Sequence, residues 1–163
     1  MVQIRPARPD EGDALGALAM RAYVAGGHLD PDEPYAREVA DGRTRLTQAD
    51  VLVLIDGDAL IGTATVCPST SPLAEIARGA EVEVRYLAID PAHWGRGHAR
   101  TLMARVEELA HEQGVDSVVL CVIEINEAGH RLYTSLGFDR MPDRDWEPVP
   151  GKMLRAYRKE LAR

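Results

Sequence analysis

The sequence predicts an α/β or α+β protein built around one central sheet. Apolar segments with the period of strands alternate along the chain with amphipathic segments that have the period of helices. One of these helices connects two buried apolar strands, 81–89 and 117–123. Strands that are joined through a helix lie parallel with a right-handed crossover, so we expect these two to form a parallel pair.

The N-terminal part of the chain predicts one strand and two helices. A short strand starts at Val2, and residues 10–25 show helical spacing of apolar side chains, with Asp10 as the expected N-cap. An acidic loop at residues 28–33 leads into a weaker helix at residues 34–43. This helix–loop–helix is either a lid over a substrate site or a solvated connector.

A β-hairpin is expected next, with strands at residues 51–56 and 59–67 around an Asp-Gly-Asp turn. Gly62 interrupts its second strand, which indicates a bulge or a close approach of another element. A loop rich in Pro and Ser follows at residues 68–80, with a short helical turn expected at residues 73–77.

The central strand alternates two kinds of side chain. Glu81, Glu83 and Arg85 fall on one face, and Val82, Val84 and Tyr86 fall on the other. Two helices are predicted beyond this strand: one at 97–113 that ends at Gly114, and a short one between the N-cap Asn126 and Gly137. The strand 117–123 lies between them in the sequence. A strand that begins at Phe138, a loop at 141–152 and a last strand at 153–161 follow, and the last strand is expected at a sheet edge.

Composition indicates one domain over residues 1–163 with an ordinary core, since 45% of the residues are hydrophobic and 28% are charged. The net charge of −7 disfavours nucleic acid as a partner and suits a cationic substrate better. The charged N-terminus is no signal peptide and no apolar run is long enough to span a membrane, so we expect a cytoplasmic protein. Cys67 and Cys121 fall in apolar strands, which indicates buried free thiols, and no metal-ligand spacing is present.

A glycine-rich elbow at Gly95 and Gly97 separates the central strand from the next helix. The bare N–H groups and the positive dipole end of such a helix bind anions, and glycine lets the backbone approach a ligand closely. A dinucleotide fingerprint would need G-x-G-x-x-G and an acidic end to the next strand, whereas this chain has Gly95-x-Gly97-x-Ala99 and a next strand that ends in Val122 and Ile123. A phosphate-binding P-loop would need Gly-Lys-Ser/Thr, which is missing here.

Two linked motifs at residues 81–138 resemble the acyl-CoA-binding half of the GNAT (Gcn5-related) N-acetyltransferase superfamily. The first is Leu87-Ala88-Ile89-Asp90-Pro91 followed by Trp94-Gly95-Arg96-Gly97-His98-Ala99, and the second runs from Asn126 through Leu132-Tyr133 to Gly137-Phe138. The close resemblance covers about a third of the chain. It implies a GNAT fold: a mixed, mostly antiparallel sheet of about seven strands, flanked by about four helices, with the parallel pair splayed apart.

The resemblance also implies acetyl-CoA as co-substrate. Backbone groups of the central strand would bond the pantetheine arm, and the elbow would hold the diphosphate. The chain departs from the family at Trp94, where Arg or Gln is usual, although Arg96 and Arg100 can still reach phosphates. The expected cofactor-binding residues are Leu87, Ala88, Ile89, Trp94, Gly95, Arg96, Gly97, His98, Ala99, Arg100 and Asn126.

The implied reaction is direct transfer of an acetyl group to a primary amine in a ternary complex. Such an amine needs a base, for which Glu83 is the first candidate and Glu81 and Glu124 are rivals. Tyr133 matches the family's general acid for the leaving thiolate. A route through Cys121 as nucleophile lacks an accompanying His motif.

Two alternatives stay open, a catalytically silent acyl-CoA-binding or sensor module and a transferase that uses a longer acyl-CoA. The acceptor is a small-molecule or peptide amine that the sequence does not identify further. In the family, the loop at 141–152 borders the acceptor site or the partner in a homodimer, and no nucleic acid, membrane or metal is expected to take part.

Overall fold

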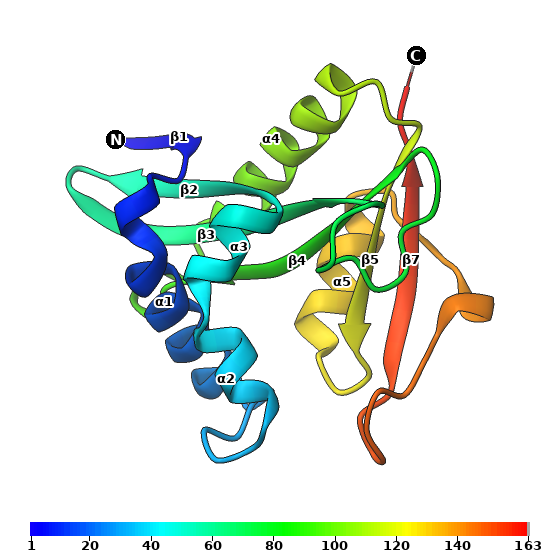
Figure 1. Ribbon diagram of the computed structural model, residues 1–163, viewed down its shortest axis with the longest axis horizontal. Coiled ribbons are helices and arrows are strands. Elements are labelled where there is room, and N and C mark those ends of the chain that lie inside the picture. Colours follow the sequence, from blue (N-terminus) through cyan, green and yellow to red (C-terminus); the bar gives the residue numbers. More distant parts are fainter. Residues whose placement is uncertain (163) are drawn as a thin grey trace.

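Seven strands form one open, mixed sheet in the computed structural model, which describes residues 1–162 (Figure 1). They are β1 (Val2–Pro6), β2 (Asp50–Asp56), β3 (Ala59–Pro68), β4 (Glu81–Ile89), β5 (Ser117–Ile123), β6 (Asp139–Arg140) and β7 (Leu154–Glu160). Their order is β1-β2-β3-β4-β5-β7-β6. The β4–β5 pair is parallel and the other neighbouring pairs of the described strands are antiparallel, which confirms the predicted mixed sheet.

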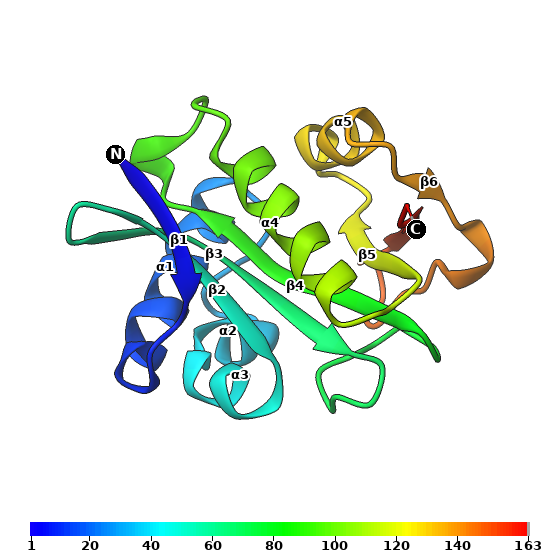
Figure 2. The same cartoon turned by 90° about the horizontal axis from the view of Figure 1, so that it is seen from above.

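Helices cover both faces of this sheet. They are α1 (Gly12–Ala25), α2 (Tyr35–Ala40), α3 (Gly42–Gln48), α4 (His98–Glu112) and α5 (Glu127–Ser135), with short 3₁₀ turns at Pro9–Glu11, Pro91–His93 and Pro142–Arg144. Figure 2 shows α1, α2 and α3 on one face of β2–β4 and α4 on the other, with α5 beside β5. Within the part of the chain that the structure describes, no helix has the length and apolar character needed to cross a membrane.

Strand alternation explains this two-sided cover. In β2, Val51 and Val53 share a buried cluster with Leu15 of α1, whereas Leu52 and Leu54 pack in the main core with Leu102 of α4. Both faces of the strand are therefore apolar and both are buried.

The helical part of the N-terminal half differs from the prediction in two places. The single helix expected at 34–43 is two short helices that meet at Asp41, whose side chain accepts the N–H of Thr44 at 3.1 Å and so starts α3. Asp10 is not an N-cap, because it lies inside the 3₁₀ turn and the N-cap position of α1 falls on Glu11. The helix count is therefore five among the described residues, against about four expected.

A β-bulge at Tyr86 reverses the alternation of β4. Thr63 pairs with Ala88 and Thr65 with Arg85, so two residues of β4 oppose the single residue between the two threonines. Tyr86 has a φ of 54°, which is unusual for a bulky residue. The prediction that it shares a face with Val84 is wrong: Val84 packs in the α4 core, whereas Tyr86 packs with α1 and α2.

The parallel strands separate soon after they begin to pair. β4 pairs with β5 only from Glu81 to Val84, opposite Ser117–Leu120. The C-terminal half of β4, from Arg85 to Ile89, has no partner on that side among the described strands. The expected splay is thus present and it starts at the bulge.

Three further local predictions have different outcomes. The hairpin strand bulges beside Gly62, and a Cβ there would lie 2.8 Å from Cδ1 of Ile89, so the interruption marks both a bulge and a close approach. No helical turn forms at residues 73–77, which form an irregular loop. The strand β7 is not an edge, because it lies between β5 and β6.

Candidate active site

A cavity of about 300 Å³, here called the central cavity, opens where β4 and β5 diverge. Its walls come from the bulged part of β4, from residues 120–123 of β5, from the segment that joins α1 to α2 and from the loop before β7. The bulge therefore creates the cavity, because a regular β4 would continue to pair with β5 and fill the space.

Glu83 lies at this cavity with a side chain that is almost completely buried. Its Oε1 accepts the backbone N–H groups of Glu75, Ile76 and Ala77 at 2.8, 2.7 and 3.0 Å. These three hydrogen bonds take the place of the helical turn predicted at 73–77, because the N–H groups of the loop bind a carboxylate instead of the carbonyl oxygens of a helix. No donor among the described residues binds Oε2.

Glu75 is a site residue that the sequence did not reveal. Its carboxylate lines the central cavity, and its Oε1 lies 3.2 Å from Nε of Arg85. Burial outweighs this ion pair and raises the pKa of Glu75 to about 7. A carboxylate with that pKa is suited to accept a proton near neutral pH. The residue stands in an irregular loop outside both motifs, so no spacing signal could have identified it.

Arg85 organises the charged side of the cavity. Its side chain is buried and donates hydrogen bonds to the carbonyl oxygen of Leu73 at 3.0 Å and to the hydroxyl of Tyr35 at 3.1 Å. Its Nη1 lies 3.6 Å from Oε1 of Glu38. The guanidinium also stacks on the ring of Tyr86, at 4.5 Å from the centroid, and so helps to fix the bulge.

Tyr133 of α5 lines the cavity with a ring that is packed edge-on against Phe138, at 5.7 Å between centroids. Burial raises the pKa of Tyr133 above its ordinary value, so the phenol keeps its proton throughout the neutral range. The side chain combines a packed aromatic with a potential proton donor.

The two rival carboxylates lie elsewhere. Glu81 is held by Arg144 at 2.6 Å and by Arg158 at 3.5 Å, and Glu124 forms an ion pair with Arg155. Neither Glu81 nor Glu124 lines the central cavity.

A second, shallower hollow of about 180 Å³, here called the elbow pocket, forms at the N-terminus of α4. Gly95 and Gly97 both have φ of 78°, and a Cβ on either would meet open space, so the backbone is accessible there. The pocket is lined by Ile89, His93, Trp94, Gly95, Gly97, His98, Ala99, Arg100 and Leu132. Most of the residues predicted to hold the cofactor are thus brought together.

The other predicted cofactor residues are distributed around the splay. Leu87 and Asn126 line the central cavity, where Asn126 also caps α5 by accepting the N–H of Gly129 at 2.9 Å. Ala88 packs against α1 and α2, and Arg96 is exposed outside the elbow pocket.

Two side chains fasten the elbow to its surroundings. Trp94 donates from Nε1 to the carbonyl oxygen of Ile89 at 2.7 Å, which ties the elbow to the end of β4. Arg100 donates to Oγ of Ser135 at 2.6 Å, which ties the start of α4 to α5. The tryptophan that departs from the family motif therefore has a structural function at the elbow.

Both cysteines are free, as predicted, although only Cys67 is fully buried. Cys121 lines the central cavity, and burial raises its pKa to about 12, so little reactive thiolate is present near neutral pH. Within residues 1–162, no group of three or more His, Cys, Asp or Glu is placed to hold a metal ion.

Comparisons with solved structures place the fold among acetyltransferases. The PaiA N-acetyltransferase of Thermoplasma acidophilum, in complex with coenzyme A, superposes with a TM-score of 0.76 over 96% of this chain and 98% of that chain, at 15% identity. YncA of Salmonella typhimurium, in a structure with its cofactor acetyl-CoA, gives a TM-score of 0.72 over 100% of this chain and 95% of that chain, at 22% identity. At sequence identities this low, the similarity to these two structures is a similarity of fold.

Sequence comparison gives the family. The N-acetylaspartate synthetase of Danio rerio is 37% identical over 70 residues, which are 43% of this chain and 25% of that protein, so the match spans about a quarter of the relative's length. The model of the Acetyltransferase (GNAT) family matches residues 13–138, which include both the glycine-rich elbow and the segment Asn126–Phe138. The chain is a member of the GNAT acetyltransferase family.

Proposed function

We propose that this protein is an acetyl-CoA-dependent N-acetyltransferase that transfers the acetyl group directly to a primary amine. The observation that carries the proposal is that the unpaired half of β4 leads from the central cavity, which holds a buried tyrosine and a pair of carboxylates, toward the elbow pocket, which Ile89 at the end of that strand lines.

The residues present fit acetyl-CoA as co-substrate. The open backbone at Gly95 and Gly97, at the start of α4, offers N–H groups to a diphosphate. The unpaired backbone of β4 around Leu87 offers hydrogen bonds to the amides of the pantetheine arm, in the way that a neighbouring strand would. A free N–H of that segment is also suited to stabilise the oxyanion during transfer.

Three proton transfers accompany the formation of the amide. The amine arrives protonated, gives one proton to a carboxylate and then forms the N–C bond as the C–S bond breaks. Tyr133 gives its proton to the departing sulfur and regains one from solvent. The second proton of the amine leaves to water, or to the same carboxylate after that group has released the first proton to solvent.

Glu83 and Glu75 are the two candidates for that carboxylate. Glu83 lies on the central strand and has one oxygen free, whereas its other oxygen is taken up by three amides. Glu75 has the pKa of a base that works near pH 7. We favour Glu75 as the base, with Glu83 holding the loop that carries it.

Conservative substitutions of the two glutamates and of Tyr133 test the proposed base and acid in a thiol-release assay with acetyl-CoA and a panel of amines. We expect Glu75→Gln and Tyr133→Phe each to lower kcat by about 10²-fold or more while acetyl-CoA binds normally. Glu83→Gln keeps an acceptor oxygen for the three amides, so we expect a smaller loss. A larger loss in Glu83→Gln than in Glu75→Gln would assign the base to Glu83.

The same assay tests the overall activity. If the wild-type protein binds acetyl-CoA but releases no thiol above background with any amine, the enzyme proposal fails and a silent acyl-CoA-binding module replaces it.

A further inference from the structure

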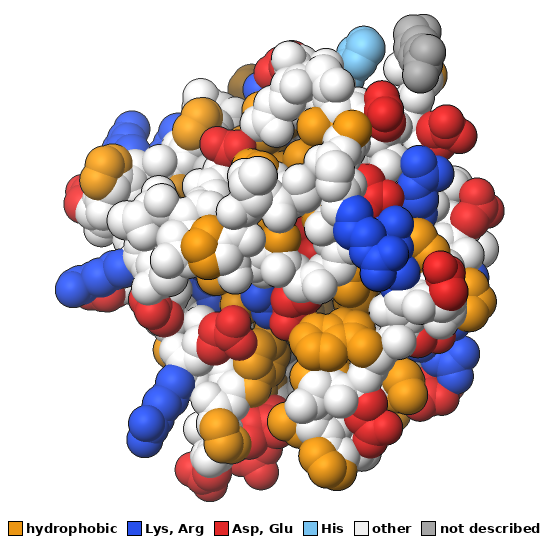
Figure 3. All heavy atoms as spheres, turned by 45° about the vertical axis from the view of Figure 1, so that its right-hand side comes forward, with side chains coloured by type: hydrophobic (Ala, Val, Ile, Leu, Met, Phe, Trp, Pro, Cys, Tyr) orange, Lys and Arg blue, Asp and Glu red, His pale blue; other side chains and the backbone are white. Residues whose placement is uncertain are grey.

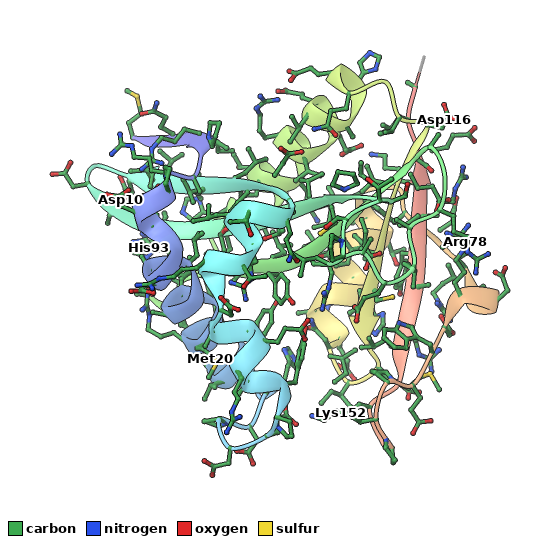
Figure 4. All side chains as sticks on the ribbon, viewed as in Figure 1. Asp10, Met20, Arg78, His93, Asp116 and Lys152 are labelled. Carbon is green, nitrogen blue, oxygen red and sulfur yellow. The ribbon has the colours of Figure 1, made fainter. Side chains whose placement is uncertain are left out.

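The cationic side chains that line the central cavity are already engaged by the protein. Arg85 is held by Glu75, by Tyr35 and by a backbone carbonyl, and it lies near Glu38. Lys152 lies in the loop before β7 (Figure 4), and its Nζ forms an ion pair with Oε2 of Glu33 at 3.3 Å. Each cation thus already has a carboxylate of the protein as a partner.

His28 adds no positive charge to this lining. Its imidazole stands at the end of α1, and burial lowers its pKa, so it is neutral at pH 7. Besides this imidazole, the titratable lining consists of the two engaged cations, the phenols of four tyrosines, the thiol of Cys121 and the carboxylates of Glu33, Glu38, Glu75 and Glu83.

Carboxylates therefore outnumber cations around the cavity by four to two. The least enclosed of them is Glu38 of α2, whose side chain is 46% exposed and contacts Arg85 only at 3.6 Å through Oε1. Tyr23 and Tyr35 line the same side of the cavity and provide aromatic rings. A carboxylate beside aromatic rings is a favourable environment for an ammonium group.

We propose that the acceptor is an amine that carries a second positive charge, such as a linear diamine, and that Glu38 with Tyr23 and Tyr35 binds the second charge. This substrate class depends on the acetyl transfer proposed above. The reacting amine then lies toward Glu75 and Tyr133, and the distal ammonium lies toward α2.

An acceptor with a free carboxylate is disfavoured by the same lining. Aspartate, the amino acid in the name of the N-acetylaspartate synthetases, would bring its carboxylates among four acidic side chains, where both cations already pair with carboxylates of the protein. This chain and that relative are thus expected to differ in their acceptors while they share family motifs.

Calorimetric binding to the wild-type protein saturated with coenzyme A gives a readout without turnover. The probes are a series of linear diamines, the monoamines of matched length and aspartate. We expect a diamine to bind at least about tenfold more tightly than its monoamine, and aspartate to bind no better than the monoamine.

Kinetics of two variants locate the second charge. We expect Glu38→Gln to raise the KM of the diamine about tenfold, with little effect on the monoamine or on kcat. The control Glu112→Gln removes the same charge from the exposed end of α4, remote from the cavity, and should leave both KM values unchanged.

Equal binding of diamine and monoamine, or an equal effect of the two variants, would overturn the inference even if every amine were acetylated. Absence of thiol release with all amines, in a protein that binds the diamine as expected, would instead refute the proposed activity and leave the diamine site standing.

Discussion

At the scale of single residues, the proposed reaction depends mainly on the pair formed by Glu75 and Glu83. The carboxylate of Glu83 collects the amides of residues 75–77, and that arrangement presents the side chain of Glu75 at the cavity beside Arg85. One acidic residue thus shapes the loop and the other is left with a pKa of about 7.

The pH dependence of kcat/KM follows from this arrangement. Since a general base must be deprotonated, activity should rise with pH through about 7, the pKa of Glu75, and then reach a plateau. The raised pKa of Tyr133 keeps the acid protonated across that plateau. Rates measured from pH 5 to 9 check this, and an inflection that persists unchanged in Glu75→Gln would contradict the assignment.

The glycines of the elbow provide a second residue-level test. Gly97 and Gly57 both have positive φ and open space at the Cβ position, but Gly57 lies in the β2–β3 turn, away from the elbow pocket. Replacing either glycine with Ala should lower the free energy of unfolding by about 1–2 kcal/mol in urea titrations. Only Gly97→Ala should also weaken the binding of acetyl-CoA, and equal binding by the two variants would place the diphosphate elsewhere.

At the scale of elements, the bulge in β4 decides where the site lies. It moves Tyr86 to the face of α1 and α2, between the guanidiniums of Arg45 at 3.8 Å and Arg85 at 4.5 Å from the ring centroid. These contacts offset the strain of a positive φ at a bulky residue, which costs about 1–3 kcal/mol. The strand then separates from β5 and opens the central cavity.

Two helix caps with the same geometry allow an effect on stability to be distinguished from an effect on cofactor binding. Asp41 caps α3 and Asn126 caps α5, but only Asn126 lines the central cavity. Either residue replaced by Ala should lose about 1 kcal/mol of stability, because one helix N–H loses its acceptor. We expect the KM of acetyl-CoA to rise only in Asn126→Ala. If the KM of acetyl-CoA is unchanged in Asn126→Ala, Asn126 acts only as the cap of α5.

The sequence was sufficient for elements whose signals are local. Strand 81–89, strand 117–123 and the cap at Asn126 are all where periodicity and capping rules put them. The face of Tyr86 was missed because a bulge adds one residue without a sequence mark, and the break at Asp41 was missed because propensity alone continued the helix. Glu75 was missed because tertiary contact with Glu83 and Arg85, and not spacing, brings it to the site.

At the scale of the whole molecule, charge is distributed unevenly between surface and cavity. The net charge is −7, yet acidic and basic side chains are interspersed on the face that Figure 3 presents. The central cavity, in contrast, has carboxylates in excess among its described lining residues, and each of its two cations already pairs with one of them. With four carboxylates against two cations, the cavity has a net excess of negative charge where a cationic acceptor would enter.

Initial rates measured over a matrix of acetyl-CoA and diamine concentrations, with the product identified by mass spectrometry, test direct acetyl transfer. Because burial raises the pKa of the Cys121 thiol to about 12, transfer through that residue is disfavoured, and the proposed route has both substrates bound together. We predict intersecting double-reciprocal lines and a monoacetylated diamine. Parallel lines, or the absence of acetylated product, would contradict direct transfer to an amine at this site.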